Sequence, residues 1–124
     1  MKLKNILIAV SDVGKSKEFY KTLFGLDVIR DFGENVMLTE GLVLQEKTLF
    51  EKGIGRSVSF GSHDAELYFE ENDMDGFLKR LDECGFEVTI LQKEQENSWG
   101  RRVVRLYDPD RHVIEIGEVV NRAI

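Results

Sequence analysis

The residues of this chain that could do chemistry lie on short alternating segments rather than in one compact motif. Glu115 stands between Ile114 and Ile116 in RLYDPDRHVIEIGE, just after a turn built from DPDRH. A second carboxylate, Glu66, begins the segment ELYFE, in which polar and apolar residues alternate. On a strand, such a side chain points either to water or into a pocket, where it can accept a proton or bind a cation. Glu115 and Glu66 are therefore the candidate catalytic residues.

Strand alternation predicts which other side chains share a face with these carboxylates. In ELYFE, Tyr68 and Glu70 fall on the face of Glu66, and in the strand before DPD, Arg105 and Tyr107 fall together. A buried guanidinium must be paired, so Arg105 would bind Glu66, Glu70 or an anionic ligand, and we favour an internal ion pair.

Two further residues complete the predicted ligand-binding set. Leu7 shares a face of the first strand with Asn5, and Trp99 is the only tryptophan of the chain, on a polar segment. Trp99 could stack on a planar ligand or lie in a dimer contact. The predicted ligand-binding residues are Leu7, Tyr68, Trp99, Arg105 and Tyr107.

Composition restricts the class of protein. The chain has 124 residues, enough for one self-sufficient core, and a formal charge of −6 from 17 basic and 23 acidic residues. It has no long basic cluster and no apolar run of membrane-spanning length, so we expect neither a nucleic-acid nor a membrane partner. Cys84 is the only cysteine, which excludes a disulfide within the chain, and we expect a cytoplasmic protein without a signal peptide.

The most informative feature is an internal repeat. The segment NILIAVSDVGKSKEFYKTLFGLDVI (5–29) has the same order of signals as ELYFEENDMDGFLKRLDECGFEVTI (66–90). Each has an alternating strand, a helix-capping aspartate, an amphipathic helix, a glycine that ends the helix and a second strand. The aspartates are Asp12 and Asp73, and the glycines are Gly25 and Gly85.

The strands that follow predict the same fold for both halves. We expect strands at 27–32, 35–39 and 42–46 in the first half, and at 86–92, 101–107 and 112–117 in the second. The prediction is an α+β fold of two βαβββ modules, at about 1–46 and 62–118, within a single domain spanning 1–124. The linker at 47–61 would contain one helical turn before Gly53. The modules would form a curled mixed sheet around a central cup, with the helices on the outer face.

Two such modules resemble the vicinal oxygen chelate superfamily, which contains glyoxalase I, bleomycin-resistance proteins and extradiol dioxygenases. The resemblance covers nearly the whole chain and rests on AVSDVGKSKEFYKTLFGLDV, ENDMDGFLKRLDECGFEV and DPDRHVIEI. The last segment is the most specific, because the family commonly ends in DPDG-(N/H)-x-x-E. Arg111 occupies the place of that glycine and would be mildly strained if the turn needs a left-handed residue.

The resemblance implies a divalent metal at the centre of the cup, bound by one ligand from the first and one from the last strand of each module. Carried over by position, these ligands fall on Asn5, Gln45, Glu66 and Glu115. The family set is typically His or Gln, Glu, His and Glu, so both histidines are lost here.

Two interpretations of this site remain open. Either the four residues hold a divalent ion such as Mg, Mn, Ca, Zn or Ni, or the cup binds an organic molecule without metal. We favour the metal-free interpretation, because the imidazoles are the usual high-affinity ligands.

Three kinds of function therefore compete. The preferred one is a glyoxalase- or bleomycin-resistance-like protein that binds a small organic molecule beside a degenerate metal site. The alternative is a metal-dependent lyase, isomerase or dioxygenase of the glyoxalase I type that uses Glu115 and Glu66. A module without any ligand is the third, and the charged residues predicted inside the cup argue against it. Because open sheets leave unpaired edges, we also expect a homodimer.

Overall fold

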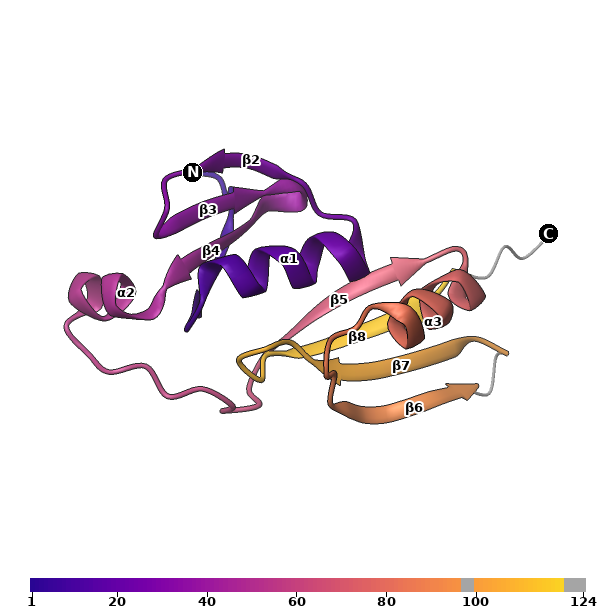
Figure 1. Cartoon of the computed structure of the whole chain (residues 1–124). Coiled ribbons are helices and arrows are strands. Elements are labelled where there is room, and N and C mark those ends of the chain that lie inside the picture. The colour runs from indigo at the N-terminus through magenta and orange to yellow at the C-terminus, as the bar shows by residue number, and fades with distance from the viewer. Residues whose placement is uncertain (97–99, 120–124) are drawn as a thin grey trace. The chain divides into compact units, whose positions relative to one another are not determined.

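The computed structural model describes residues 1–96 and 100–119 of the chain (Figure 1). It divides into two compact units, Met1–Ser59 and Phe60–Ile124. Each unit contains one βαβββ module with a four-stranded mixed sheet, which confirms the predicted α+β fold and the repeat. None of the helices in the described part of the chain is long and apolar enough to cross a membrane.

The sheet of the first unit has the strand order β1-β4-β3-β2, in which β1 pairs with β4 in parallel and the other neighbours are antiparallel. The unit also contains a short 3-10 turn before its last strand and a helix after it. The elements are β1 (Ile6–Val10), α1 (Val13–Phe24), β2 (Val28–Asp31), β3 (Asn35–Leu38), the turn Thr39–Gly41, β4 (Leu42–Glu46) and α2 (Lys47–Ile54).

The second unit repeats this arrangement. Its strand order is β5-β8-β7-β6, with β5 parallel to β8 and the other pairs antiparallel. The elements are β5 (Glu66–Glu71), α3 (Met74–Glu83), β6 (Ile90–Glu96), β7 (Arg102–Tyr107) and β8 (Val113–Glu118).

Local signals at the helix ends account for both modules. The Asp12 carboxylate accepts a hydrogen bond from the Lys15 amide (3.0 Å), and the Asp73 carboxylate accepts one from the Gly76 amide (3.0 Å). These caps satisfy amide groups that have no partner within the first turn. At the other end of α1, Gly25 adopts the left-handed conformation (φ 66°), as expected for a glycine that ends a helix.

Two boundaries differ from the prediction. The linker holds a helix of two turns, α2, because the Glu46 carboxylate caps it at the Leu49 amide (3.1 Å) and it ends only at Gly55. Gly53 lies inside this helix rather than after it. Strand β6 begins at Ile90 and continues to Glu96, whereas we expected a strand at 86–92.

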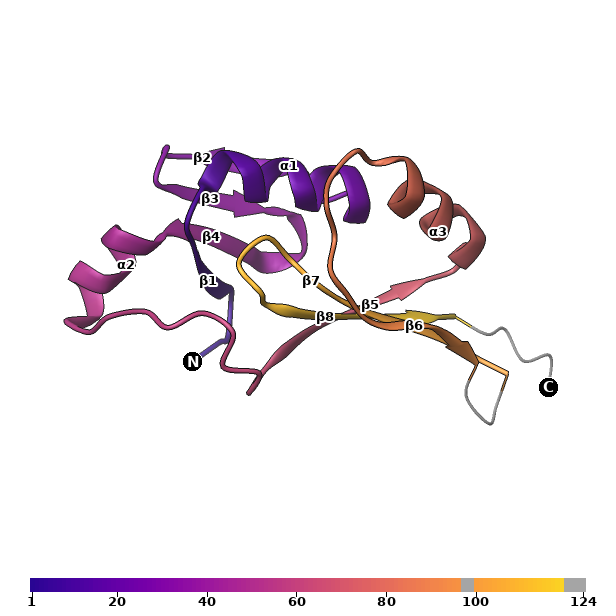
Figure 2. The same ribbon diagram turned by 60° about the horizontal axis from the view of Figure 1, so that its bottom comes forward.

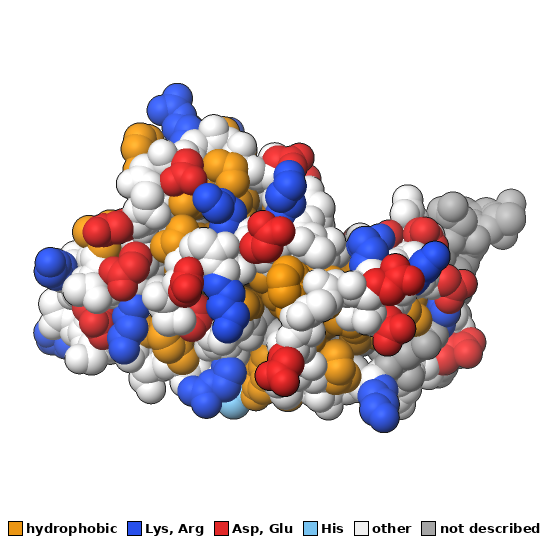
Figure 3. Space-filling model, viewed as in Figure 1, with side chains coloured by type: hydrophobic (Ala, Val, Ile, Leu, Met, Phe, Trp, Pro, Cys, Tyr) orange, Lys and Arg blue, Asp and Glu red, His pale blue; other side chains and the backbone are white. Residues whose placement is uncertain are grey.

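Alternation gives the second sheet one apolar and one polar face. Val104, Leu106, Ile114 and Ile116 are buried on one face, and Figures 1 and 2 show α3 over that side of the sheet. The polar face carries the side chains described below. On the surface viewed in Figure 3, acidic and basic side chains are interspersed.

Candidate functional site

A row of four side chains crosses the polar face of the second sheet. Tyr68 on β5 pairs with Glu115 on β8, Glu115 pairs with Arg105 on β7, and Arg105 pairs with Gln92 on β6. Residues directly opposite each other on neighbouring strands lie close enough for their side chains to interact. The predicted residues Tyr68, Arg105 and Glu115 are therefore brought together on one face.

Arg105 is the centre of this row. Its Nη2 donates to Oε1 of Glu115, and its Nη1 donates to Oε1 of Gln92. Its Nε lies 3.8 Å from Oε1 of Glu66. The ion pair with Glu66 agrees with the prediction, whereas Glu115 as the nearer partner was not predicted. Each nitrogen of the guanidinium thus faces a carboxylate or amide oxygen, and both candidate catalytic carboxylates face the same cation.

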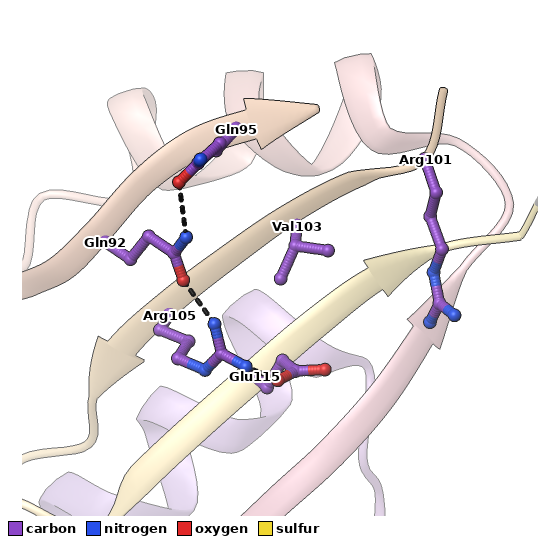
Figure 4. Close-up of a pocket in the computed structure, with 6 residues that line it drawn as sticks. All are labelled: Gln92, Gln95, Arg101, Val103, Arg105 and Glu115. Atoms are coloured by element: carbon purple, nitrogen blue, oxygen red, sulfur yellow. Dashed lines mark hydrogen bonds and ion pairs between the residues drawn. The ribbon is translucent and has the colours of Figure 1, made fainter. Parts of the chain in front are cut away.

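An irregularity in β6 brings a second glutamine to this face. Gln92 pairs with Arg105 and Gln95 with Val103, so three steps along β6 oppose two along β7. On a regular strand Gln92 and Gln95 would point to opposite faces, but an extra residue re-aims the side chains. The Gln92 Nε2 donates to the Gln95 Oε1 (2.6 Å), which continues the hydrogen-bonded row beyond Arg105 (Figure 4).

These side chains surround a pocket of about 290 Å³ on the polar face (Figure 4). The residues that line it are Gln92, Gln95, Arg101, Val103, Arg105 and Glu115. Of these, sequence reasoning missed Gln92, Gln95 and Arg101. The two glutamines could not be found without knowing the bulge, whereas Arg101 shares the strand alternation of Val103 and Arg105 and could have been included.

Arg101 extends from the start of β7 across β8 toward β5 (Figure 4). The carbon of its guanidinium lies 5.4 Å from the centre of the Tyr68 ring, within cation–π distance. Gly117 on β8 makes this possible, because a Cβ there would overlap the Arg101 guanidinium and lie 2.5 Å from the Tyr68 hydroxyl. A small residue at position 117 thus leaves the space that both side chains use.

The neighbouring Arg102 belongs to the opposite face. Its guanidinium binds the Glu118 carboxylate (2.7 Å) and the Asp75 carboxylate on α3 (2.7 Å). The side-chain hydrogen bond from Arg102 lowers the pKa of Glu118 below its ordinary value. This cluster ties β7 and β8 to α3 and has a structural role.

Tyr107, another of the predicted ligand-binding residues, interacts with a histidine. Its hydroxyl is hydrogen-bonded to Nε2 of His63, and the two ring centres are 5.6 Å apart. The turn that follows is held by Asp108, whose buried carboxylate accepts from the amides of Asp110 and His112 and contacts the His112 ring nitrogen (2.7 Å). Tyr107 does not line the pocket.

Arg111 in this turn adopts the left-handed conformation, with φ of 65°. This confirms the strain predicted for an arginine in the family's glycine position. The Arg111 side chain donates to the Phe60 carbonyl (3.0 Å), which fixes the segment before β5 to the turn.

The predicted residues of the first unit lie on its own sheet. Asn5 is exposed and precedes β1, and Leu7 on β1 pairs with Val43 on β4. The Gln45 amide donates to Oδ1 of Asn35 (3.0 Å). Trp99 lies outside the described residues.

The strand registers differ from the predicted equivalence of Gln45 and Glu115. Asn5 and Glu66 each lie seven residues before a capping aspartate, so they are equivalent, and Leu7 is then the counterpart of Tyr68. Glu115 pairs with Tyr68, whereas Leu7 pairs with Val43. Val43 therefore occupies the place of Glu115 in the first module. The prediction of Gln45 assumed a pairing of β1 with β4 that is shifted by two residues from the observed one.

Three observations concern the predicted metal site. Across residues 1–96 and 100–119, no group of three or more histidine, cysteine, aspartate or glutamate side chains could hold an ion. The two carboxylates of the predicted set, Glu66 and Glu115, face the Arg105 guanidinium. The register places Val43, which has no ligand atom in its side chain, at the remaining last-strand position.

The chain is thus an α+β protein of two repeated βαβββ modules, and the second module has a pocket on the polar face of its sheet. A family model described as a glyoxalase-like domain matches residues 3–121. The chain therefore belongs to the glyoxalase-like family, within the vicinal oxygen chelate superfamily.

Individual proteins are similar to this chain in sequence or in structure. The uncharacterized protein YraH of Bacillus subtilis (strain 168) is 28% identical over 125 residues, which cover 94% of this chain and 97% of YraH. A protein of unknown function from Agrobacterium tumefaciens C58 has a similar structure, with 33% identity, a TM-score of 0.82, and coverage of 97% of this chain and 95% of that one. A glyoxalase-related enzyme from Fulvimarina pelagi shares the fold at 19% identity, with a TM-score of 0.80 and coverage of 95% and 88%.

Proposed function

We propose that this protein binds a small organic molecule on the polar face of its second sheet and does so without a divalent metal. The observation that carries the proposal is the position of Arg105, whose guanidinium pairs with Glu115 and lies 3.8 Å from Glu66. These are the carboxylates of the family-equivalent metal set, and here they face a permanent cation that belongs to the chain itself.

Electrostatics favour this interpretation over a metal-dependent enzyme. A divalent ion bound by Glu66 and Glu115 would stand within a few ångströms of Arg105, and like charges at such distances repel strongly where the carboxylates are partly buried. Metal binding also needs free carboxylates, which here would first have to leave the guanidinium. A glyoxalase I-type lyase or isomerase, or a dioxygenase, would need a metal electrophile that this donor set is poorly suited to hold.

The pocket supports binding of a small organic molecule. Its volume of about 290 Å³ is at the small end of the usual range for ligand pockets. Val103 gives it an apolar wall, and Arg101, Gln95 and Glu115 give it polar groups that could orient a ligand. The sequence predicts a cup shared by the two modules, which would enlarge this site. The shared cup stays a prediction.

We also propose a homodimer. Strand β1 lies at the edge of the first sheet and exposes Ile6 and Leu7, and β2 at the other edge exposes Ile29, with Phe32 just beyond it. Apolar side chains along sheet edges suit burial against a second copy. A dimeric mass in sedimentation equilibrium supports this proposal, and a monomeric mass at micromolar concentration contradicts it.

Small organic compounds screened by amide NMR, with a chelator present throughout, test the proposed function. We expect compounds that shift the amide signals of Val103, Arg105 and Glu115, with the same affinity whether the chelator or excess manganese is added. Binding that appears only with manganese contradicts the proposal, and so does a screen in which no compound shifts these signals.

A further inference from the structure

We propose that the pocket on the second sheet selects an uncharged organic molecule that carries a hydrogen-bond acceptor at one end and a donor at the other. Gln95 donates to the acceptor, Glu115 accepts from the donor, and Val103 contacts the apolar part between them, since all three residues line the pocket. This inference deepens the proposed function and rests on it, because it names the chemistry of the molecule that the pocket takes.

The orientation of the Gln95 amide follows from Arg105. A guanidinium has only N–H donors, so the group of Gln92 that faces Nη1 of Arg105 must be its carbonyl oxygen. The Gln92 nitrogen then faces Gln95 and donates to the Gln95 oxygen, at 2.6 Å (Figure 4). The Gln95 nitrogen is left with two N–H groups that form no hydrogen bond within residues 1–96 and 100–119. Because each bond of this row has a fixed direction, Gln95 offers a donor to the pocket.

Glu115 offers an acceptor to the same pocket. Its Oε1 accepts from Nη2 of Arg105, and its Oε2 takes part in no hydrogen bond with any other residue that the structure describes. The Glu115 side chain is only 15% exposed, so this oxygen has limited access to water. A hydrogen bond from a ligand to a partly buried, ionised carboxylate is stronger than one between two neutral groups. An N–H or O–H group of the ligand is therefore favoured at Glu115.

The two polar groups belong to strands on either side of β7. Gln95 on β6 pairs with Val103, and Glu115 on β8 pairs with Arg105, two residues further along β7. Neighbouring strands are about 4.8 Å apart, which separates β6 from β8 by roughly 10 Å. A molecule that reaches both groups must therefore carry its acceptor and its donor at opposite ends. Val103 stands between them, which favours an apolar middle.

The charges on this face favour a molecule without a net charge. The side chains of β5, β7 and β8 on the polar face, together with Arg101 at the start of β7, bring two positive and three negative formal charges to it. They are Arg101, Arg105, Glu66, Glu70 and Glu115. The excess of one negative charge repels an anion, and a cation placed near Glu115 meets the guanidinium of Arg105. Arg101 enters this count through its charge alone.

A series of para-substituted benzenes separates these contributions. In para-hydroxyacetophenone a carbonyl acceptor and a phenolic donor lie at opposite ends of an apolar ring. The donor is lost in para-methoxyacetophenone and the acceptor in para-ethylphenol, while para-hydroxybenzoate adds a negative charge and para-hydroxybenzylamine a positive one. Each compound is titrated into the full chain by amide NMR near neutral pH with a chelator present. We expect para-hydroxyacetophenone to shift the signals of Val103 and Glu115 and to bind about three- to tenfold more tightly than each of the others.

Two variants assign this preference to its residues. Gln95→Glu can still accept from Gln92 but has no donor, so it should weaken binding of para-hydroxyacetophenone about three- to tenfold and leave binding of para-ethylphenol unchanged. Glu115→Gln can still present an oxygen to Arg105, and an NH2 group then takes the place of Oε2. In that variant para-hydroxyacetophenone should lose its advantage over para-methoxyacetophenone.

The matched control is Glu118→Gln. Glu118 is a carboxylate on the same strand as Glu115 and is likewise paired with an arginine, Arg102, but on the opposite face of the sheet. The change should leave the order of affinities for the whole series intact. Unchanged amide spectra away from the pocket show that each variant is folded.

The wild-type chain alone can overturn the inference. Equal binding of para-hydroxyacetophenone and either para-methoxyacetophenone or para-ethylphenol contradicts it, as does tighter binding of the benzoate or the benzylamine. Absence of binding by para-hydroxyacetophenone contradicts it too, and so does an unchanged preference in Gln95→Glu or Glu115→Gln. If other organic compounds still shift the signals of Val103 and Glu115 in these cases, the proposed function stands and only the selection of an uncharged donor–acceptor molecule fails.

Discussion

Replacing Arg105 by methionine should destabilise the protein by about 2 kcal/mol at neutral pH, because the change leaves a partly buried carboxylate without its cation. The Glu115 side chain is only 15% exposed, while Arg105 is 39% exposed. Loss of a partner for such a carboxylate costs about 1–3 kcal/mol, and the longer contact of Arg105 with the 39% exposed Glu66 adds at most about 1 kcal/mol.

A double-mutant cycle isolates the interaction between Arg105 and Glu115. Glu115→Gln alone should cost about 1 kcal/mol, and adding it to Arg105→Met should cost less than the sum of the two single changes by about 1 kcal/mol or more. The matched control is Arg30→Met on the exposed strand β2, which should change the free energy of unfolding by less than about 0.5 kcal/mol.

Urea unfolding of the four proteins and the control gives these free energies. A cost for Arg105→Met as small as that of the control, or strict additivity of the two changes, would refute the ion pair. Stabilisation by Glu115→Gln would do so too, because it would mean that Glu115 is repelled by Glu66 rather than held by Arg105.

Three further predictions concern elements that position the site. Asp108→Asn should cost about 2 kcal/mol in urea unfolding, because one of the two buried carboxylate oxygens that face His112 is replaced by an NH2 donor. No measurable cost would argue against these hydrogen bonds between Asp108 and His112. Gly25→Ala should cost about 1 kcal/mol by the same measurement, because alanine is strained at a φ of 66°. An unchanged free energy of unfolding would mean that α1 does not need a left-handed residue at position 25. The hydrogen bond from Arg102 lowers the pKa of Glu118 in the folded state, so the contribution of Glu118 to stability is present above the ordinary glutamate pKa and is lost as the pH falls through the folded value. Glu118→Gln should therefore make the free energy of unfolding decline less steeply in acid. An unchanged slope would contradict the hydrogen bond from Arg102.

The order of elements could be predicted from the sequence because it depends on local chemistry. Asp12 and Asp73 cap their helices, and Gly25 ends the first of them, as their positions predict. The faces of β5 and β7 also follow from alternation, which placed Tyr68 and Arg105 correctly on one face. Such features are set by neighbours in the chain, and a single sequence is enough to identify them.

The composition of the pocket depended on pairing between strands that are distant in sequence. The bulge in β6 that brings Gln92 and Gln95 to one face leaves no mark in the sequence QKEQE. The counterpart of Glu115 was misplaced for a related reason: register between β1 and β4 is fixed by tertiary packing, and it selects Val43 instead of Gln45. The choice of partner by Arg105 likewise required knowing that Glu115 lies directly opposite.

Elemental analysis of the protein, purified without a chelating tag and without added chelator, tests the central claim most directly. Arg105 faces the two carboxylates that the family resemblance assigns to a metal, so we expect the purified chain to contain far less than one divalent ion per molecule. A content close to one manganese, zinc, nickel, magnesium or calcium ion per chain would contradict the claim that Arg105 takes the place of the metal.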